Sequence, residues 1–227
     1  MDVTVIADST DDGLTPVTAQ MVGAAASIGG NPTVLCPGGV GASEAASISG
    51  VSKVVSVEGD CFGTYEGGAW ATALDSQATG DLVLAAASPR GRDIAASLAA
   101  LRKIPIIQDA TGLEVGLVVS RPIYSGKAME TLNVDGPCVI TLRANAFDAA
   151  PSGGSADVST VNQSADVGLA VKEAIAKASE RLDVAEADII ISGGRGMGEP
   201  SNFSHLNEVA DMIGAAVGAS RAAVDTW

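Results

Sequence analysis

The sequence DLVLAAASPRGR at residues 81–92 decides the fold class of this chain. Residues 81–87 are apolar after Asp81 and predict a buried strand, and Ser88 and Pro89 then mark the start of a helix that reaches residue 101. Residues 104–108 are again apolar and predict another strand. A strand that is apolar along its length needs cover on both faces, so this strand–helix–strand unit indicates a parallel sheet between two layers of helices.

The same alternation runs through the first eighty residues of the chain. Residues 3–7, 32–36 and 53–57 are short β-branched runs that predict strands, whereas residues 14–28 and 66–77 carry apolar side chains at helical spacing. The fold class predicted from these units is α/β, a doubly wound and mostly parallel sheet.

The pattern changes after residue 110. Residues 111–125 and 138–143 are expected to be extended segments without intervening helices, added antiparallel to the sheet. Residues 148–158 (DAAPSGGSADV) predict a loop at a surface or a domain boundary, and residues 166–182 predict an amphipathic helix. The remaining predicted elements are a strand at 187–192, a glycine-rich loop at 193–198, a helix to about residue 213 and a last strand at 215–221.

Composition and charge limit the classes of function. The 227 residues include 27 acidic and 13 basic side chains, a formal net charge of −14, so the basic face that binds nucleic acid is not expected. We expect no membrane insertion and no targeting segment, and therefore a cytoplasmic protein, because the sequence has neither a long apolar run nor a basic region before one. Three widely spaced cysteines fit a reducing compartment. With one histidine, His205, which we expect to be a surface or packing residue, a zinc site built on Cys and His is not expected.

Three groups of residues are candidate ligand sites, and each has a purely structural alternative. The loop at 193–198 (GGRGMG) follows a strand at the edge where α/β sheets bind ligands, and Arg195 adds a positive charge; the alternative is a tight turn with an incidental arginine. A second candidate is Ser220 with Arg221, near the end of the last predicted strand, where Arg221 could stabilise negative charge on a ligand; the alternative is an ordinary surface arginine. Residues 88–92 form either a phosphate site or a capped helix start. The loop does not match GxGxxG, and no complete GxxxxGK[ST] pattern occurs.

Several stretches together resemble the alpha subunit of electron transfer flavoproteins. Similarities to the first domain of that family lie at residues 90–101, 105–109, 121–126 and 139–147. The most specific similarities are SGGRGM at 192–197, Asn202 with Phe203, and GAAVGASRAAVD at 214–225. Order and spacing agree with the family over nearly the whole chain.

The resemblance implies two domains and a flavin cofactor, FAD. Residues 1–186 would be a Rossmann-like N-terminal domain that packs against a beta subunit, and residues 187–227 would be the start of the FAD-binding domain. Arg195 would lie near the flavin ring system, and Ser220 and Arg221 would face its N5 region. A guanidinium is always charged, so it would stabilise the negative charge that the flavin gains with one electron.

The resemblance also implies a role for the chain. It would carry electrons rather than turn over a substrate, as a heterodimer with the beta subunit. Acyl-CoA dehydrogenases of fatty acid beta-oxidation, or similar flavoenzymes, would be the donors, and the electron transfer flavoprotein-quinone oxidoreductase would be the acceptor. Two alternatives stay open: a docking module that binds the beta subunit without holding FAD, and a nucleotide-dependent enzyme.

The sequence departs from the family pattern at its end. The family continues past the Ser-Arg strand into a VGQTGK loop and an SGxxQH segment that hold further parts of FAD, and neither occurs here. Residues 224–227 read VDTW where the family usually has a glycine before the aromatic residue. We therefore expect a truncated FAD-binding domain and incomplete binding of FAD.

Overall fold

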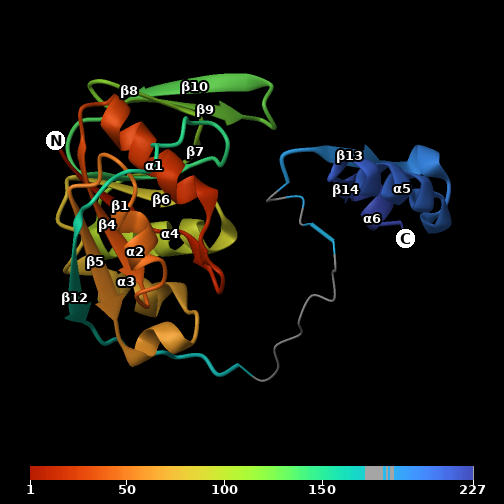
Figure 1. The fold of residues 1–227 in the computed structure, drawn as a ribbon. Helices are drawn as coiled ribbons and strands as arrows, with labels where there is room; N and C mark the ends of the chain where they lie inside the picture. Colours follow the sequence, from red (N-terminus) through yellow and green to blue (C-terminus); the bar gives the residue numbers. More distant parts are fainter. Residues whose placement is uncertain (172–180, 183, 185–186, 227) are drawn as a thin grey trace. The chain divides into compact units, whose positions relative to one another are not determined.

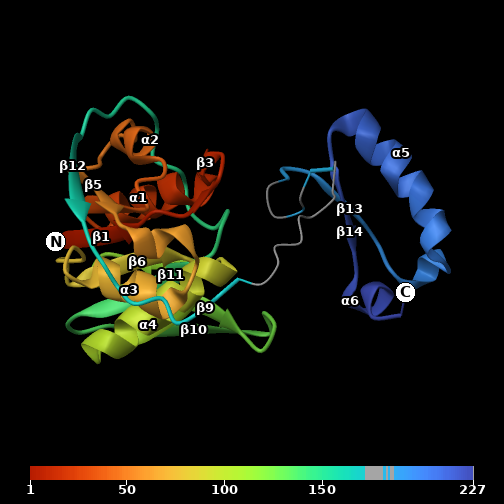
Figure 2. The same cartoon turned by 90° about the horizontal axis from the view of Figure 1, so that it is seen from below.

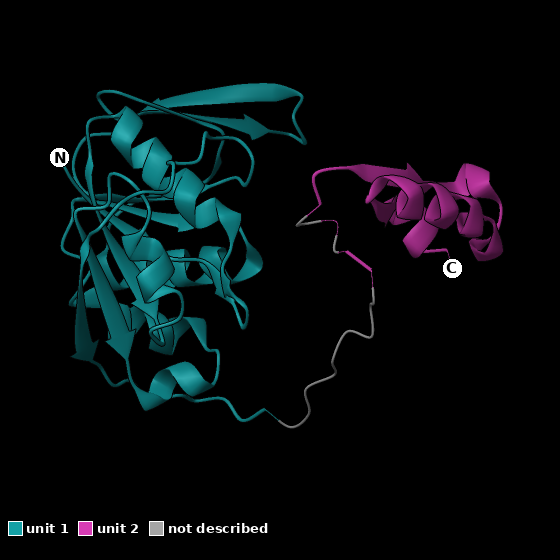
Figure 3. Cartoon of the chain, in the orientation of Figure 1, with its two compact units in different colours: residues 1–171 teal, residues 172–227 magenta. Residues whose placement is uncertain are grey.

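A computed structural model describes residues 1–171, 181–182, 184 and 187–226. The chain divides into two compact units, unit 1 at residues 1–171 and unit 2 at residues 172–227 (Figure 3). Each unit has its own sheet and is described by itself.

Unit 1 is built on a seven-stranded sheet in the order β12-β5-β4-β1-β6-β11-β7, and every neighbouring pair in it is parallel (Figure 1). The chain fills one side of β1 first and then crosses to the other side, which confirms the doubly wound α/β fold. The strands are β1 (Asp2–Ile6), β4 (Asn31–Pro37), β5 (Lys53–Glu58), β6 (Leu82–Ala86), β7 (Ile106–Ala110), β11 (Cys138–Leu142) and β12 (Asp157–Asn162).

Helices cover both faces of this sheet, as the apolar strands predict. In Figure 2, α1 (Pro16–Ser27) and α2 (Ala42–Ala46) lie on one face, and α3 (Gly67–Asp75) and α4 (Pro89–Arg102) lie on the other. Short elements occupy the connections at one edge of the sheet: β2 (Ser9–Thr10), β3 (Gly13–Leu14) and the 3-10 turn η1 (Asp60–Gly63).

The side chains of the sheet alternate between two cores. In β6, Leu82, Leu84 and Ala86 lie in the core beneath α1, whereas Val83 and Ala85 lie in the core beneath α3 and α4. All five are at most 2% exposed, so this strand is buried on both faces, as its sequence indicates. Small aliphatic side chains dominate both cores, which allows close packing of the helices on the sheet.

The loop predicted at residues 148–158 lies against the helices of one face. The Ala150 amide donates to the Ala19 carbonyl of α1 at 2.9 Å, and the Gly153 amide donates to the Ser47 carbonyl next to α2 at 2.9 Å. A Cβ atom on Gly23 would come within 2.1 Å of the Asp148 carbonyl oxygen, so only glycine permits this approach. The loop ends at residue 156, and the chain then forms the edge strand β12.

The two extended segments after β7 differ from the antiparallel additions that we expected. Residues 111–125 contribute to a separate antiparallel sheet in the order β10-β9-β8, made of β8 (Gly112–Glu114), β9 (Val118–Ile123) and β10 (Ala128–Asn133). Strand β11, in contrast, pairs parallel with both β6 and β7, so the antiparallel expectation for residues 138–143 is wrong. Parallel neighbours need a crossover, and here the antiparallel sheet supplies the crossover that a helix usually makes.

The helix predicted at 166–182 is not found in its first residues. Residues 163–171 follow β12 without helix or strand, whereas residues 172–180 lie outside the described residues. The prediction is therefore wrong for residues 166–171. No helix in the described parts of the chain has the length and apolar character needed to cross a membrane.

Unit 2 contains one parallel strand–helix–strand unit, as predicted. Strands β13 (Ile190–Gly193) and β14 (Ala216–Ala219) pair in parallel, with α5 (Phe203–Ile213) between them in sequence. Gly214 ends α5 in the left-handed conformation, with φ 67°. The remaining elements are two 3-10 turns, η2 (Arg195–Met197) and η3 (Pro200–Asn202), and the short helix α6 (Arg221–Val224).

Candidate functional site

The glycine-rich loop begins where β13 ends, and its first glycine is needed for packing. A Cβ atom on Gly193 would lie 2.8 Å from Cζ of Phe203 and 2.9 Å from Cδ1 of Leu206. Gly196, in the same loop, has no such neighbour within 4 Å. Gly193 therefore lets α5 approach the strand end, whereas Gly196 leaves the backbone open to a ligand.

The glycine-rich loop is not followed directly by a helix. Two 3-10 turns separate Gly194 from Phe203, where α5 begins, so the α5 N-terminus is not adjacent to Arg195 in the sequence. Asn202 fixes this segment instead, because its Nδ2 atom donates to the Met197 carbonyl at 2.6 Å. The side chain of Arg195 is exposed within this braced loop.

Ser220 and Arg221 lie just beyond the last strand rather than in it. Strand β14 ends at Ala219, and Ser220 is the N-cap of α6, with its hydroxyl accepting a hydrogen bond from the Ala223 amide at 3.4 Å. Arg221 is the first residue of α6, and its side chain is 92% exposed. The strand predicted at 215–221 therefore ends two residues early, because the Ser220 hydroxyl favours a helix start.

The fold brings the two predicted motifs together. Gly193 pairs with Ala219 in the parallel ladder, so β13 and β14 end at the same edge. The Ser220 amide donates to the Gly193 carbonyl at 2.9 Å, and a Cβ atom on Gly194 would lie 3.3 Å from the Ser220 hydroxyl oxygen. The sequence-predicted residues Arg195, Ser220 and Arg221 thus belong to one carboxyl edge of one sheet.

The chemistry of this edge is that of hydrogen-bond donors and positive charge. Arg195 and Arg221 each present a guanidinium that carries donors and no acceptor, and Ser220 adds a hydroxyl. Asp225 lies one helical turn after Arg221, and its Oδ2 atom is 3.2 Å from Nε of Arg221. This ion pair holds the Arg221 side chain along α6 while leaving it exposed. The donor set fits a ligand with acceptor atoms that gains negative charge.

The third candidate, residues 88–92, is a capped helix start. The Ser88 hydroxyl accepts a hydrogen bond from the Gly91 amide at 3.0 Å and donates to Oδ1 of Asp8 at 2.8 Å, which confirms the capping interpretation. The Arg90 guanidinium stacks 5.1 Å above the Tyr65 ring centroid, and Arg92 pairs with Asp109 at 3.2 Å. Both cations therefore have partners within unit 1, which disfavours a phosphate site. His205 is exposed on α5, as expected.

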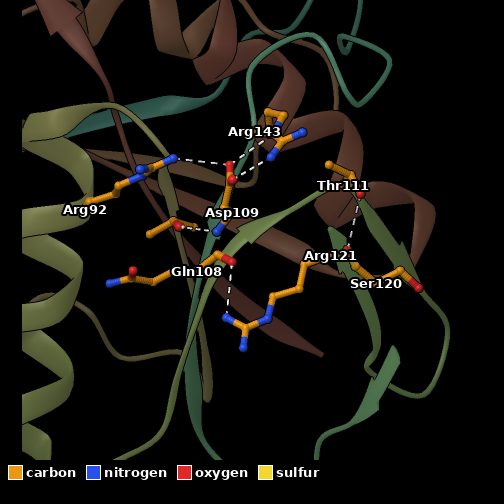
Figure 4. A network of polar contacts seen from close by, with 8 residues as sticks. Arg92, Gln108, Asp109, Thr111, Ser120, Arg121 and Arg143 are labelled. Carbon is orange, nitrogen blue, oxygen red and sulfur yellow. Dashed lines mark hydrogen bonds and ion pairs between the residues drawn. The ribbon is translucent and has the colours of Figure 1, made fainter. Parts of the chain in front are cut away.

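A second polar centre joins three elements at the carboxyl edge of the unit 1 sheet (Figure 4). The Asp109 carboxylate accepts hydrogen bonds from Nε and Nη2 of Arg143 at 3.1 and 2.6 Å, and Arg92 lies on its other side. The bond to Arg143 is the main reason that the pKa of Asp109 lies below its ordinary value. The Asp109 amide is held by the buried hydroxyl of Thr141 at 2.9 Å. Sequence reasoning missed this centre because its members are far apart in the chain.

A cavity of about 650 Å³ lies at the carboxyl ends of β1, β4, β5 and β12. Its walls include the rings of Phe62, Tyr65 and Trp70, which pack edge to face at 5.1 Å between centroids. Its charged lining residues are three acids and one base: Asp11, Glu58, Asp60 and Arg90. This net negative lining disfavours a phosphate ligand. The glycines that follow β4 and β5 are the sequence signal that could have located it.

All three cysteines are buried and free. Burial raises the pKa of the Cys36 thiol to about 12, with a further contribution from the Glu44 carboxylate, and burial raises that of Cys138 to about 11. These two side chains stay thiols at neutral pH, so they serve packing rather than nucleophilic chemistry.

Comparison with known proteins agrees with the division of the chain into two units. A family model described as "Electron transfer flavoprotein domain" matches residues 3–166, and one described as "Electron transfer flavoprotein FAD-binding domain" matches residues 183–227. The electron transfer flavoprotein subunit alpha of Paracoccus denitrificans is 37% identical over 217 residues, which cover 92% of this chain and 70% of that protein. The subunit alpha of Pseudomonas aeruginosa is 38% identical over 233 residues, covering 99% of this chain and 75% of that protein.

Proposed function

This chain belongs to the electron transfer flavoprotein alpha-subunit family, and on that premise we propose that it is an FAD-dependent electron carrier that works as a heterodimer with a beta subunit. In this proposal it acts in the cytoplasm and catalyses no substrate turnover of its own. Its electrons come from acyl-CoA dehydrogenases or similar flavoenzymes and pass to a quinone oxidoreductase. Residues 1–186 form the N-terminal domain, and residues 187–227 belong to the FAD-binding domain.

One observation carries this proposal: the hydrogen bond from the Ser220 amide to the Gly193 carbonyl, at 2.9 Å, joins the two motifs that the family resemblance assigns to the flavin. The residues at this edge fit FAD because its ring system is rich in acceptor atoms and the edge offers donors. FAD, when bound, supplies the one-electron redox chemistry. Arg195 and Arg221 would hold the acceptor side of the ring and favour the reduced, more negative form, and Ser220 would orient it by a hydrogen bond.

Co-expression of the source organism's whole alpha-subunit gene, which encodes this chain, with its beta subunit tests the proposal. We expect the purified complex to show the visible absorbance of bound flavin and to be reduced by an acyl-CoA dehydrogenase with its substrate. Loss of flavin from a complex that still forms would contradict the carrier function and favour the docking module. That second candidate has support in the two-stranded sheet of unit 2, because a sheet of two strands is marginal on its own.

The role of Arg221 can be tested on the same complex. Removing its positive charge with Arg221→Ala should lower the flavin midpoint potential, by about 60 mV for a tenfold weaker preference for the one-electron reduced form. Arg221→Lys keeps the charge and should retain most of the potential, whereas Lys127→Ala in unit 1 is a charge-loss control that should leave it unchanged. An Arg221→Ala complex with the wild-type potential would remove Arg221 from the site.

A further inference from the structure

The two arginines of the candidate site are held in different ways. Arg221 pairs with Asp225 at 3.2 Å, so its side chain has a partner on its own helix. Within the part of the chain that the structure describes, the Arg195 guanidinium makes no hydrogen bond and no ion pair, and its side chain is exposed. The position of this charge therefore depends on the backbone of residues 194–198.

That backbone forms one tight turn and then reverses. The Met197 amide donates to the Gly194 carbonyl at 2.9 Å, and the Gly198 amide donates to the Arg195 carbonyl at 3.0 Å, which gives the 3-10 turn η2. Gly198 then has φ of 86°, and the chain turns back toward α5. Both hydrogen bonds join residues three apart, so they fix the shape of the turn but not its position relative to the helix.

Asn202 supplies the contact that fixes this position. Its Nδ2 atom donates to the Met197 carbonyl at 2.6 Å, and a Cβ atom on Gly198 would lie 3.7 Å from the same Nδ2 atom. Among the described residues, no other side chain hydrogen bonds to the backbone of residues 194–198. This one bond therefore joins the turn that carries Arg195 to the residue directly before α5.

Helix α5 gives Asn202 a fixed place on the sheet. The helix contacts both β13 and β14 (Figure 2), and Phe203 and Leu206 lie against Gly193, where a Cβ atom would not fit. Because Asn202 precedes Phe203 in the chain, its side-chain amide starts from an anchored point. The bond to the Met197 carbonyl thus ties the turn to the packed part of unit 2.

The Asn202 side chain serves the turn rather than the helix. Asn202 is the N-cap residue of α5, a position where asparagine usually accepts a hydrogen bond from an amide of the first helical turn. Here the side chain makes no such cap hydrogen bond. Replacing Asn202 therefore removes the bond to Met197 without removing a helix cap, so the two roles can be separated by experiment.

We infer that Asn202 is the positioning residue for Arg195. By holding the Met197 carbonyl, its amide fixes the turn that carries the Arg195 guanidinium at the carboxyl edge of β13 and β14. The inference rests on the proposed function, in which Arg195 lies near the flavin ring system. A charge that is already in place stabilises developing negative charge better than one on an unfixed loop, because the protein need not reorganise when the charge appears.

The flavin midpoint potential of the alpha–beta complex, made from the whole alpha-subunit gene, tests this inference. Arg195→Ala should make the potential more negative, and Asn202→Ala should reproduce at least about half of that shift. The double variant should have the potential of Arg195→Ala alone, because Asn202 acts through Arg195. Asn202→Gln keeps the amide donor and should lie between Asn202→Ala and the wild type. Ser201→Ala removes only the neighbouring bond to Glu199 at 2.7 Å, so it is the matched control and should leave the potential unchanged.

Hydrogen exchange of the same complexes reports on the turn itself. Asn202→Ala should speed exchange of the Met197 and Gly198 amides by about tenfold or more, since both donate within the turn. The amides of β13, β14 and α5 should keep their wild-type rates, since no helix cap is lost.

Three outcomes would overturn the role of Asn202 alone. Additive shifts in the double variant would show that Asn202 acts independently of Arg195. A wild-type potential in Asn202→Ala, beside a shifted Arg195→Ala, would show that Arg195 needs no such support. Faster exchange throughout α5 would make Asn202 a residue of general stability. A wild-type complex without flavin, or an Arg195→Ala complex with the wild-type potential, would instead overturn the proposed flavin site and the role of Asn202 with it.

Discussion

The Asp109 carboxylate shows how one residue ties distant parts of unit 1 together. It accepts from Arg143 after β11, pairs with Arg92 in α4, and lies one residue before the end of β7 with φ at 65°. Asp and Asn tolerate this left-handed conformation better than most residues. Asp109 therefore combines a left-handed backbone conformation with a carboxylate that binds both arginines.

Replacing Asp109 with Asn isolates the contribution of its charge, because Asn keeps the preference for the left-handed conformation. We expect a loss of about 1 kcal/mol in the free energy of unfolding at pH 7, measured by urea denaturation. The lowered pKa of Asp109 means that its charge stabilises the fold above pH ~4, and that this contribution is lost as the pH falls through the lowered value. The difference between the wild type and the variant should therefore shrink only below pH ~4. A difference that already disappears between pH 7 and pH 5 would contradict this assignment.

Gly193 and Gly196 provide a matched pair in the glycine-rich loop. Gly193→Ala puts a methyl group within 2.8 Å of the Phe203 ring and should destabilise unit 2 by about 1–3 kcal/mol. Gly196→Ala meets no atom within 4 Å and should change stability by less than about 0.5 kcal/mol. Hydrogen exchange of the amides in β13 and β14 is the measurement, and equal exchange rates in the two variants would count against the packing role of Gly193.

At the scale of elements, the position of β11 depends on one buried hydroxyl as well as on apolar packing. Thr141 is fully buried, and its Oγ1 accepts the Asp109 amide at 2.9 Å, which fixes the end of β7 beside β11. Thr141→Val keeps the shape of the side chain and leaves that amide without its acceptor, so we expect a loss of about 1–3 kcal/mol in urea denaturation. Thr160→Val, at an exposed position of β12, is the control and should lie within about 0.5 kcal/mol of the wild type. Equal stability of the two variants would show that this hydrogen bond contributes little.

Individual elements differ in how far the sequence alone could predict them. Strand β6 is predictable because every residue in it is buried and its apolar run has no other explanation. Strand β12 (DVSTVN) is mostly exposed and polar, and it is recognisable as a strand only through its pairing with β5. The place of β11 between β6 and β7 is a tertiary property, since a crossover made of antiparallel strands has no periodic signal of its own. Local periodicity in the sequence therefore does not determine the register of a strand or its neighbours in the sheet.

At the scale of the whole molecule, the two units differ in what they can support alone. Unit 1 contains the seven-stranded sheet and both of its cores, so a chain of residues 1–171 should fold by itself. We expect it to unfold cooperatively in urea with native circular dichroism. Residues 172–227 expressed alone should show no cooperative transition, because a two-stranded sheet with one helix buries too little apolar surface. An insoluble or non-cooperative fragment 1–171 would contradict the independence of unit 1.

Some features of the candidate site follow from local sequence motifs, whereas others depend on contacts made in the folded chain. The candidate residues Arg195, Ser220 and Arg221 lie in short motifs that can be recognised in the sequence, and the strand–helix–strand order that aligns these motifs was also predicted. The helix cap at Ser220 and the brace from Asn202 to Met197 were not predicted, because each depends on a single side-chain hydrogen bond. The glycines that follow β4 and β5 mark one edge of the cavity in the sequence, but its aromatic and charged walls come from separate elements, and their assembly is a tertiary property.

The late position of β11 in the chain has a consequence for biosynthesis. A ribosome releases β6 and β7 well before β11. The edge of β6 that pairs with β11 in the folded sheet therefore stays unpaired until residue 142 has emerged. Exposed apolar strand edges attract other chains, which makes this interval the most vulnerable to aggregation and to capture by chaperones. Codons that slow translation between residues 110 and 138 would lengthen it, and a faster passage through the crossover would shorten it.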